Sequence, residues 1–256
     1  MKMYYMNAFV SDVFTGNPAA VCILPAWLDD AALQSIATEK AFPVTVFLVK
    51  EDDVWVIRWF GMEYEIPLCG HGTLAAAWIV FNELSLDTKG IIFHSPRAGK
   101  LPVRREGEKI ILSFPAQTLK KVEASYPWSS IFHATPISIY EFGEERLVAV
   151  FEDESIVQFF SPDLPALRSL PHRAVVITAP SKKVDFVSRT FYSRKKDVED
   201  PVTGASHCVL TPYWAKRLGK KYLMAHQLSA RGGALTCELN GDQVLMGGLA
   251  SLAIKQ

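Results

Sequence analysis

Two stretches of the 256-residue chain decide its fold: Leu68-Cys69-Gly70-His71-Gly72-Thr73-Leu74 and Glu199-Asp200-Pro201-Val202-Thr203-Gly204-Ala205-Ser206. In each, a strand-like run leads through a short loop to an apolar, helix-like stretch, with Gly and Thr where the helix is expected to begin. Pro201 suits the first turn of a helix, where its missing N–H leaves no intrahelical hydrogen bond unmade. The sequence therefore predicts two strand-to-helix corners of one kind.

The residues before these corners also repeat. Arg58-Trp59-Phe60 lies over Arg189-Thr190-Phe191 at an offset of 131 residues (189 − 58). The same offset lays Cys69, at the end of the first loop, over Asp200, at the end of the second.

A second match follows in the same order. The segment that begins at Gly99 lies over the one that begins at Gly233, at an offset of 134 residues (233 − 99). Each copy continues into a turn pair, Glu106-Gly107 or Asn240-Gly241, of the kind that closes β-hairpins. Two ordered matches at nearly one offset indicate two copies of one α+β unit.

The coarse pattern of elements is mixed. Runs rich in Val, Ile, Phe and Tyr predict strands at residues 3–10, 19–24, 45–49, 54–59, 110–114, 147–151 and 174–178. Helices are predicted at residues 29–40, 73–83 and 206–218. This irregular order favours an α+β fold over strict βαβ alternation. We expect one copy to span residues 1–117 and the other residues 118–256.

Composition excludes several classes of protein. The 27 Lys and Arg residues balance 27 Asp and Glu residues, which argues against a broad nucleic-acid-binding surface. A chain that is 49% hydrophobic and 21% charged is not intrinsically disordered. It has no apolar run near the roughly 18 residues of a membrane helix and no signal-peptide pattern. We expect a cytoplasmic protein that binds neither nucleic acid nor membranes.

The four cysteines are widely spaced at Cys22, Cys69, Cys208 and Cys237. They form no C-x-x-C pair, so the spacing predicts neither a zinc site nor a disulfide framework. We expect Cys22, Cys208 and Cys237 to be buried as small apolar side chains. Cys69 lies in a predicted corner and is a candidate for the chemistry.

Both corners have the properties of an anion site. The first N–H groups of a helix lack intrahelical partners and its N-terminus is partly positive, so each corner can hold an anion. If a pseudo-twofold relates the two corners, they face each other across a cleft that suits a small carboxylate-bearing substrate. The residues expected to bind it are Gly70, Gly72, Thr73, Thr203, Gly204, Ala205 and Ser206. The expected proton carriers are Cys69 and His71 at one corner and Asp200 at the other.

The first corner also satisfies a rival motif. Gly70-His-Gly72-Thr-Leu-Ala75 fits the dinucleotide fingerprint G-x-G-x-x-A. However, the preceding Glu63-Tyr-Glu65-Ile-Pro67 is not the apolar strand that such a site uses, and the second corner has no such glycine pattern. A nucleotide-dependent oxidoreductase is the least favoured interpretation.

Four segments together give the chain a specific resemblance to a known family. They are Phe14-Thr-Gly-Asn-Pro-Ala-Ala-Val21; Arg58-Trp-Phe60 with Leu68–Ala75; Asp185-Phe-Val-Ser-Arg189 with Glu199–Gly204; and Ser229-Ala-Arg-Gly-Gly233 with Val244-Leu-Met-Gly-Gly248. In this combination the chain resembles the PhzF family of phenazine biosynthesis, within the diaminopimelate-epimerase-like fold.

The resemblance implies a fold and an activity. It implies two pseudo-symmetric lobes, each a barrel-like, mostly antiparallel sheet around a central helix, with the last residues, about 249–256, crossing back to the first lobe. It further implies an isomerase that needs no cofactor and no metal, acts by acid–base catalysis and forms a homodimer. By position, Asp200 is the catalytic-site carboxylate and His71 its polar neighbour. Backbone at Gly70 and around Thr203 and Gly204 binds substrate.

The chain departs from the family at the residue that matters most. The family reads E-x-x-L-S-E-T-x-F, and its second Glu is the principal proton shuttle. Here the stretch is Glu39-Lys-Ala-Phe-Pro-Val44-Thr-Val-Phe47, so Val44 stands where that Glu is expected. The family's Gly-Ser-Ala-His is likewise Gly204-Ala205-Ser206-His207, which displaces the usual Ser by one position. Valine cannot carry a proton, and a lost shuttle costs roughly 10²–10⁴-fold in rate.

Two interpretations of the departure stay open. In one, the protein is an isomerase in which Cys69, His71 or a substrate group replaces the missing Glu, and a helix start favours the Cys69 thiolate. In the other, it is a degenerate homologue that binds a small anionic metabolite without turning it over. Val44 and Ala205 support the second.

Overall fold

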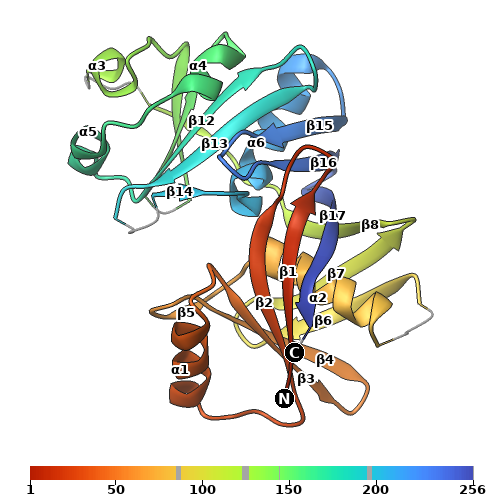
Figure 1. Ribbon diagram of the computed structural model, residues 1–256. Coiled ribbons are helices and arrows are strands. Elements are labelled where there is room, and N and C mark those ends of the chain that lie inside the picture. Colours follow the sequence, from red (N-terminus) through yellow and green to blue (C-terminus); the bar gives the residue numbers. More distant parts are fainter. Residues whose placement is uncertain (85–87, 123–126, 144, 195–197, 256) are drawn as a thin grey trace. The chain divides into compact units, whose positions relative to one another are not determined.

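The computed structural model describes residues 1–84, 88–122, 127–143, 145–194 and 198–255 (Figure 1). The chain divides into two compact units. We call Met1–Phe114 with Leu245–Gln256 the first unit, and Pro115–Val244 the second unit. The fold is mixed α+β and dominated by strands, as the order of predicted elements indicated.

The first unit contains most of the helices and strands that the sequence predicted there. In chain order its elements are β1 (Lys2–Val10), β2 (Asn17–Leu24), α1 (Asp30–Lys40), β3 (Thr45–Glu51), β4 (Val54–Phe60), β5 (Glu65–Ile66), α2 (Gly70–Asn82), β6 (Gly90–Ser95), β7 (Gly99–Glu106) and β8 (Lys109–Pro115). The final strand, β17 (Gln243–Lys255), begins in the second unit and pairs antiparallel with β1 in the first. The last residues therefore lie with the N-terminal strands.

The two faces of the first sheet carry different helices (Figure 1). Leu33 and Ala37 of α1 pack with Phe47 and Phe60 on one face. Side chains of a strand alternate between faces, so Val46 and its cross-strand partner Trp59 point the other way, toward α2. Six consecutive residues of α2, 72–77, are buried, and at about 100° per residue they cover its whole circumference. Helix α2 is therefore enclosed on all sides.

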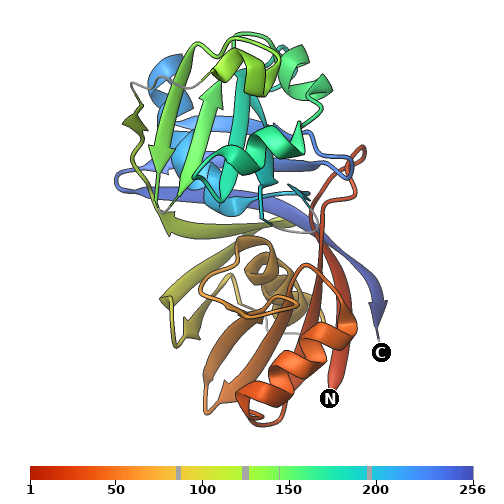
Figure 2. The same cartoon turned by 90° about the vertical axis from the view of Figure 1, so that its left-hand side faces the viewer.

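The second unit is built in the same sequence of elements, with extra short helices. They are β9 (Lys120–Lys121), α3 (Trp128–Phe132), β10 (Ser138–Phe142), β11 (Arg146–Val150), α4 (Glu154–Phe159), α5 (Leu164–Ser169), β12 (Ala174–Pro180), β13 (Phe186–Tyr192), β14 (Glu199–Asp200), α6 (Gly204–Leu218), β15 (Tyr222–Gln227) and β16 (Gly233–Asn240). Figure 2 shows α3, α4 and α5, in green to teal, together on one side of the strands, where Phe132, Val157 and Leu167 share a core with Phe151 and Val175. Residues 206–211 of α6 are all buried, so this helix is enclosed as α2 is.

Strand pairing follows one scheme in both units. In the first unit, β1–β2, β3–β4 and β6–β7 pair antiparallel, whereas β2–β3 and β4–β6 pair parallel. In the second unit, β10–β11, β12–β13 and β15–β16 pair antiparallel, whereas β11–β12 and β13–β15 pair parallel. The internal repeat in the sequence thus corresponds to a repeated order of strand pairs. The spatial pseudo-symmetry of the two lobes stays a prediction.

Candidate functional site

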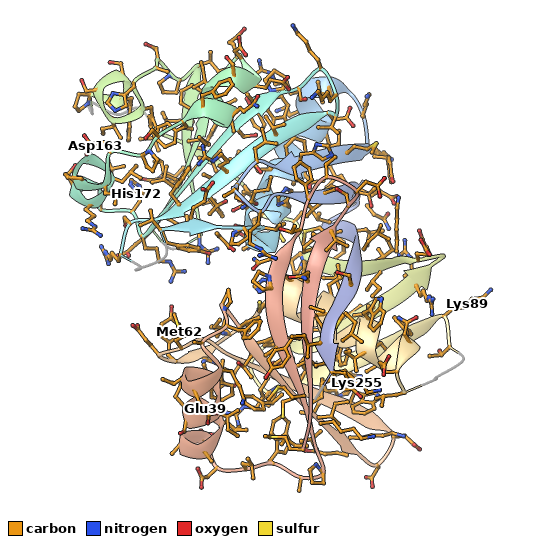
Figure 3. The ribbon with its side chains drawn as sticks, in the orientation of Figure 1. Glu39, Met62, Lys89, Asp163, His172 and Lys255 are labelled. Carbon is orange, nitrogen blue, oxygen red and sulfur yellow. The ribbon has the colours of Figure 1, made fainter. Side chains whose placement is uncertain are left out.

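The starts of α2 and α6 differ from those of the helices capped by aspartate. Asp29, Asp153 and Asp163 cap α1, α4 and α5, and each side chain accepts a hydrogen bond from its own helix (Figure 3 labels Asp163). The N-cap residues of α2 and α6 are Cys69 and Thr203, and neither side chain makes a cap hydrogen bond. The five-residue α3 also lacks such a bond. The first N–H groups of the two long buried helices are therefore not satisfied by a capping side chain, which leaves them suited to an anion.

At the α2 corner the structure brings together a thiol, an imidazole and an amide. Cys69 Sγ lies 3.4 Å from His71 Nδ1 and 3.9 Å from Nε2. The Asn17 Nδ2 atom lies 3.4 Å from the same Nδ1, and the Asn17 side chain is fully buried at the start of β2. The Nδ1 atom of His71 is therefore in contact with both the Cys69 thiol and the Asn17 amide. Sequence reasoning gave Asn17 no role beyond its place in the family motif.

Gly72 lets two strands press against the first turn of α2. A Cβ atom at Gly72 would lie 2.9 Å from Val46 Cγ2, 3.0 Å from Trp59 Cδ1 and 3.4 Å from Cys69 Sγ. No Cβ atom fits there unless the side chains of Val46 and Trp59 shift. The glycine therefore holds Cys69 and the helix start close to the sheet.

Val44 is buried on the side of the sheet that carries α2. It immediately precedes β3, and its carbonyl accepts a hydrogen bond of 3.0 Å from the Ala20 N–H. Val46, two residues further along, faces Gly72, so alternation places Val44 on the same face. The Val44 side chain is fully buried. An apolar group thus occupies the position where the family resemblance leads one to expect an acid.

At the α6 corner the Asp200 carboxylate is held by its neighbours. Asp200 ends the short strand β14, lies partly buried and pairs with Thr190 of β13. The Thr203 hydroxyl donates to Asp200 Oδ2 over 2.8 Å. The Gln227 amide donates to the Asp200 backbone carbonyl over 2.7 Å. Gln227 is a residue that sequence reasoning missed, and no motif in the chain pointed to it.

The hydroxyl groups of Thr73 and Ser206, two of the residues predicted to bind substrate, make hydrogen bonds within the protein. Thr73 Oγ1 donates to the Cys69 carbonyl over 2.6 Å, and Ser206 Oγ lies 3.1 Å from Thr190 Oγ1 in a buried pair. Ala205, between Gly204 and Ser206, is exposed. Ser206 therefore does not stand in for the serine that the family has one position earlier. The backbone N–H groups of Thr73 and Ser206 are also used within their own corners, where they donate to the carbonyls of Cys69 over 3.0 Å and of Thr203 over 3.2 Å.

The structure corrects the alignment of the two corners. The sequence offset of 131 laid Cys69 over Asp200, but the N-cap residues are Cys69 and Thr203, which are 134 residues apart (203 − 69). The connection from β13 to β14 is longer than that from β4 to β5, and this shifts the offset by three. In the strand-pairing scheme Asp200 therefore corresponds to Ile66, the last residue of β5.

A bidentate ion pair joins the two strands that precede each corner, and sequence reasoning missed both pairs. Arg58 Nε and Nη2 bond the two carboxylate oxygens of Glu65 at 2.7 and 2.9 Å. Arg189 does the same to Glu199 at 2.5 and 3.0 Å. The bonds from Glu65 raise the pKa of the Arg58 guanidinium. Each pair links a side chain of a two-residue strand to one of the long strand with which it pairs, through two charge-assisted hydrogen bonds.

The remaining buried thiols and one histidine are kept uncharged. Burial raises the pKa of Cys22 to about 11, and those of Cys208 and Cys237 to about 12. All three lie in the core, as expected for small apolar side chains. Burial lowers the pKa of His207 to about 4, so its imidazole is neutral near pH 7.

Within the described residues, no group of three or more His, Cys, Asp or Glu side chains is placed to hold a metal ion. In that same part of the chain, each helix is too short or too polar to cross a membrane.

Known proteins share the sheet-dominated α+β fold of this chain. The chain matches the family model described as phenazine biosynthesis-like protein over residues 6–255, and it belongs to that family. Two uncharacterized isomerases of Pseudomonas aeruginosa are 42% and 41% identical to it over 252 and 253 residues, 98% of this chain and 96% of each relative. A crystal structure of a PhzF-family phenazine biosynthesis protein from Enterococcus faecalis is 40% identical, with a TM-score of 0.93, and the match covers 99% of this chain and 97% of that one. The family predicted from the four sequence segments is confirmed.

Proposed function

We propose that the protein is a cofactor-independent isomerase that moves a proton on a small carboxylate-bearing substrate. The observation that carries this proposal is the contrast between helix starts: α1 is capped by its own aspartate, whereas α2 and α6 lack a capping side-chain bond. The N–H groups at Gly70, Gly72, Gly204 and Ala205 would bind the carboxylate. The proposal requires both corners to serve the same substrate molecule.

Asp200 is the proposed base. Its carboxylate would take the proton from the carbon next to the substrate carboxylate, and the electron pair of that C–H bond would move into the carboxylate as an enolate. Helix N–H groups favour the extra negative charge at that point. Asp200 would later lose this proton to water, and the second proton carrier would give one proton back to the substrate, at the opposite face of the same carbon or at a carbon conjugated with it. One proton leaves the substrate and one enters it, so the isomerisation changes no atom count.

The second proton carrier is proposed to be the Cys69–His71 pair. Val44 cannot serve, and the thiol lies 3.4 Å from the imidazole, within the longer range of hydrogen bonds that involve sulfur. The pair would deliver a proton from Sγ or from Nε2. It therefore takes the place of the glutamate that the chain lacks.

Isotope exchange tests these roles. The protein is incubated in deuterated water with small 2-amino and 2-hydroxy acids, and mass spectrometry measures deuterium bound to carbon. We expect the wild type to incorporate deuterium, Asp200→Asn to lose at least about 100-fold in rate, and Cys69→Ser with His71→Asn to lose a similar factor. Exchange that survives Asp200→Asn unchanged refutes the role of Asp200.

A second candidate function has its own observation. Val44 is fully buried, and Ser206 is turned toward Thr190 instead of replacing the family serine. A protein that keeps the anion site but has lost a proton carrier would bind a small anionic metabolite without converting it. Thermal stabilisation by a carboxylic acid with no deuterium exchange favours this binder. Stabilisation by NAD or NADP alone favours the oxidoreductase.

We also propose, from the family resemblance, that the protein is a cytoplasmic homodimer. Sedimentation velocity at micromolar concentration measures its mass in solution, which for a dimer is twice the 28.5 kDa of one chain. A single species at the mass of one chain contradicts the dimer.

A further inference from the structure

Gln227 is a buried amide whose polar atoms all serve the α6 corner. It is the last residue of β15, opposite Ser188 of β13 and Gly233 of β16, and its side chain is fully buried. A primary amide has two donors and an acceptor, and leaving them unpaired in a core costs free energy. The hydrogen bonds of Gln227 therefore stabilise the fold. The groups that they reach also show which residues Gln227 holds in place.

The geometry fixes which way the amide points. Gln227 Oε1 accepts from the Thr203 backbone N–H over 2.9 Å. Gln227 Nε2 donates to the Asp200 backbone carbonyl over 2.7 Å and contacts Thr203 Oγ1 at 3.2 Å. A backbone N–H can only donate and a carbonyl can only accept, so the reversed amide would lose both of the short bonds.

The direction of the amide sets the direction of the next hydrogen bond. With Nε2 as donor, Thr203 Oγ1 is an acceptor on the side of Gln227. The hydroxyl proton is then available for Asp200 Oδ2, which lies 2.8 Å away. His207 Nδ1 lies 2.9 Å from the Thr203 carbonyl, so Thr203 is held at its N–H, its hydroxyl and its carbonyl. The chain of donors ends on the carboxylate of Asp200.

The corresponding position in the first unit has no such role. Ser95 ends β6, the strand that matches β15, and it is also buried. Its hydroxyl accepts hydrogen bonds from the backbone N–H groups of Arg97 and Ala98, in the turn that follows. Hydrogen bonds from a buried amide at this position are therefore found at the α6 corner, which carries the Asp200 carboxylate, and not at the α2 corner.

We infer that Gln227 is a positioning residue, which orients Thr203 so that its hydroxyl donates to Asp200 and holds the carboxylate in one geometry and in its ionised form. This inference rests on the proposed function for its catalytic meaning. Its structural content, the control of Asp200 by Gln227, stands apart from any substrate.

Three variants test it. Gln227→Met keeps the length of the side chain and removes its donors and acceptor. Gln227→Glu keeps the shape and, when ionised, removes the donors. Thr178→Val is the matched control, because Thr178 is buried in the same unit and its hydroxyl bonds the Val187 carbonyl and Trp214 Nε1. Each variant is measured for thermal unfolding, for the pH at which the ¹³C signal of the Asp200 carboxyl titrates, and for deuterium exchange into the acids used above.

We expect both Gln227 variants to move the Asp200 titration to higher pH, since a carboxylate that loses an assured donor is protonated more easily. Exchange should fall about tenfold or more, the factor that corresponds to one hydrogen bond to a charged group. Thr178→Val should lower the unfolding temperature and leave the Asp200 titration unchanged. If Gln227→Met does not fold, Gln227→Leu, which is also uncharged and has neither donor nor acceptor, gives the same comparison.

Two outcomes separate the inference from the proposed function. Gln227 variants that lower stability as Thr178→Val does, with the Asp200 titration unmoved, overturn the positioning role. A moved Asp200 titration in a protein whose wild type exchanges no proton upholds the positioning role and overturns the isomerase.

Discussion

At the scale of single residues, the candidate site depends on residues that carry no charge: a glycine, a valine and a buried neutral histidine. Gly72 is required by space, because Val46 and Trp59 approach within about the distance at which no Cβ atom fits. Val44 is fully buried at the position where the family resemblance led us to expect an acid. His207 is buried without charge, and its Nε2 has no hydrogen-bond partner among the described residues. Gly72 and His207 each have a consequence for stability that can be measured.

Gly72→Ala should destabilise the protein by about 1–3 kcal/mol, because the added methyl group overpacks the gap beside Val46 and Trp59. Denaturant unfolding of the variant measures the change. Gly90→Ala is the control, since the nearest atom to its added Cβ is 3.4 Å away. Equal stabilities of the two variants would show that the start of α2 does not pack tightly against the sheet.

His207 should make the protein less stable in mild acid. Burial lowers the pKa of His207 from 6.5 to about 4. Between about pH 6.5 and pH 4 the unfolded chain therefore binds a proton at this residue that the folded chain does not bind. The free energy of unfolding should therefore fall as pH drops from about 6.5 to about 4, by about 3 kcal/mol from this residue. The difference between wild type and His207→Gln, followed by denaturant unfolding across this range, isolates its share. Parallel curves for the two proteins would contradict the assignment.

At the scale of elements, the two corners are built by the same parts. A long strand carries an arginine, a two-residue strand carries its glutamate, and the enclosed helix follows. The arginines match at the offset of 131 seen in the sequence, but the glutamates are 134 apart (199 − 65). The loop that creates this difference also moves Asp200 away from the position of Cys69.

The Arg189–Glu199 pair should contribute measurably to stability because it is bidentate and its side chains are only 11% and 23% exposed. A double-mutant cycle of Arg189→Met and Glu199→Gln should give a coupling energy of about 1–3 kcal/mol in denaturant unfolding. The exposed pair Arg104–Glu106 is the comparison and should couple by less than about 1 kcal/mol. Similar coupling energies in the two pairs would show that the buried pair does not help to hold β14 in place.

Local patterns predicted the elements that depend on neighbours in sequence. The turns at Gly107 and Gly241 have positive φ, and α1 begins after Asp29, one residue from its predicted start. Helices α2 and α6 begin three and two residues earlier than predicted, because their first turns contain glycine instead of apolar residues. The short α3, α4 and α5 were not predicted, since five or six residues show no periodicity.

The site was only partly predictable for a related reason. Cys69 and His71 are two residues apart and were identified together, as was Asp200 with Thr203. Asn17 and Gln227 reach these corners from strands 54 and 27 residues away, and no spacing rule connects them. Contacts of that kind exist only once the sheet has formed.

At the scale of the whole molecule, the proposed reaction depends on two units that repeat one order of strand pairs and differ in the chemistry of their corners. The α2 corner provides a thiol and an imidazole, and the α6 corner provides a carboxylate that is held by hydrogen bonds. A single substrate must meet both if a proton is to be taken by one group and returned by another.

Amide NMR tests this most directly. The ¹⁵N-labelled protein is titrated with a carboxylic acid that stabilises it, and the amide signals of Gly70, Gly72 and Gly204 are followed. We expect the signals from both corners to shift together and to saturate with one dissociation constant. Shifts confined to one corner, or two unequal constants, would contradict this expectation.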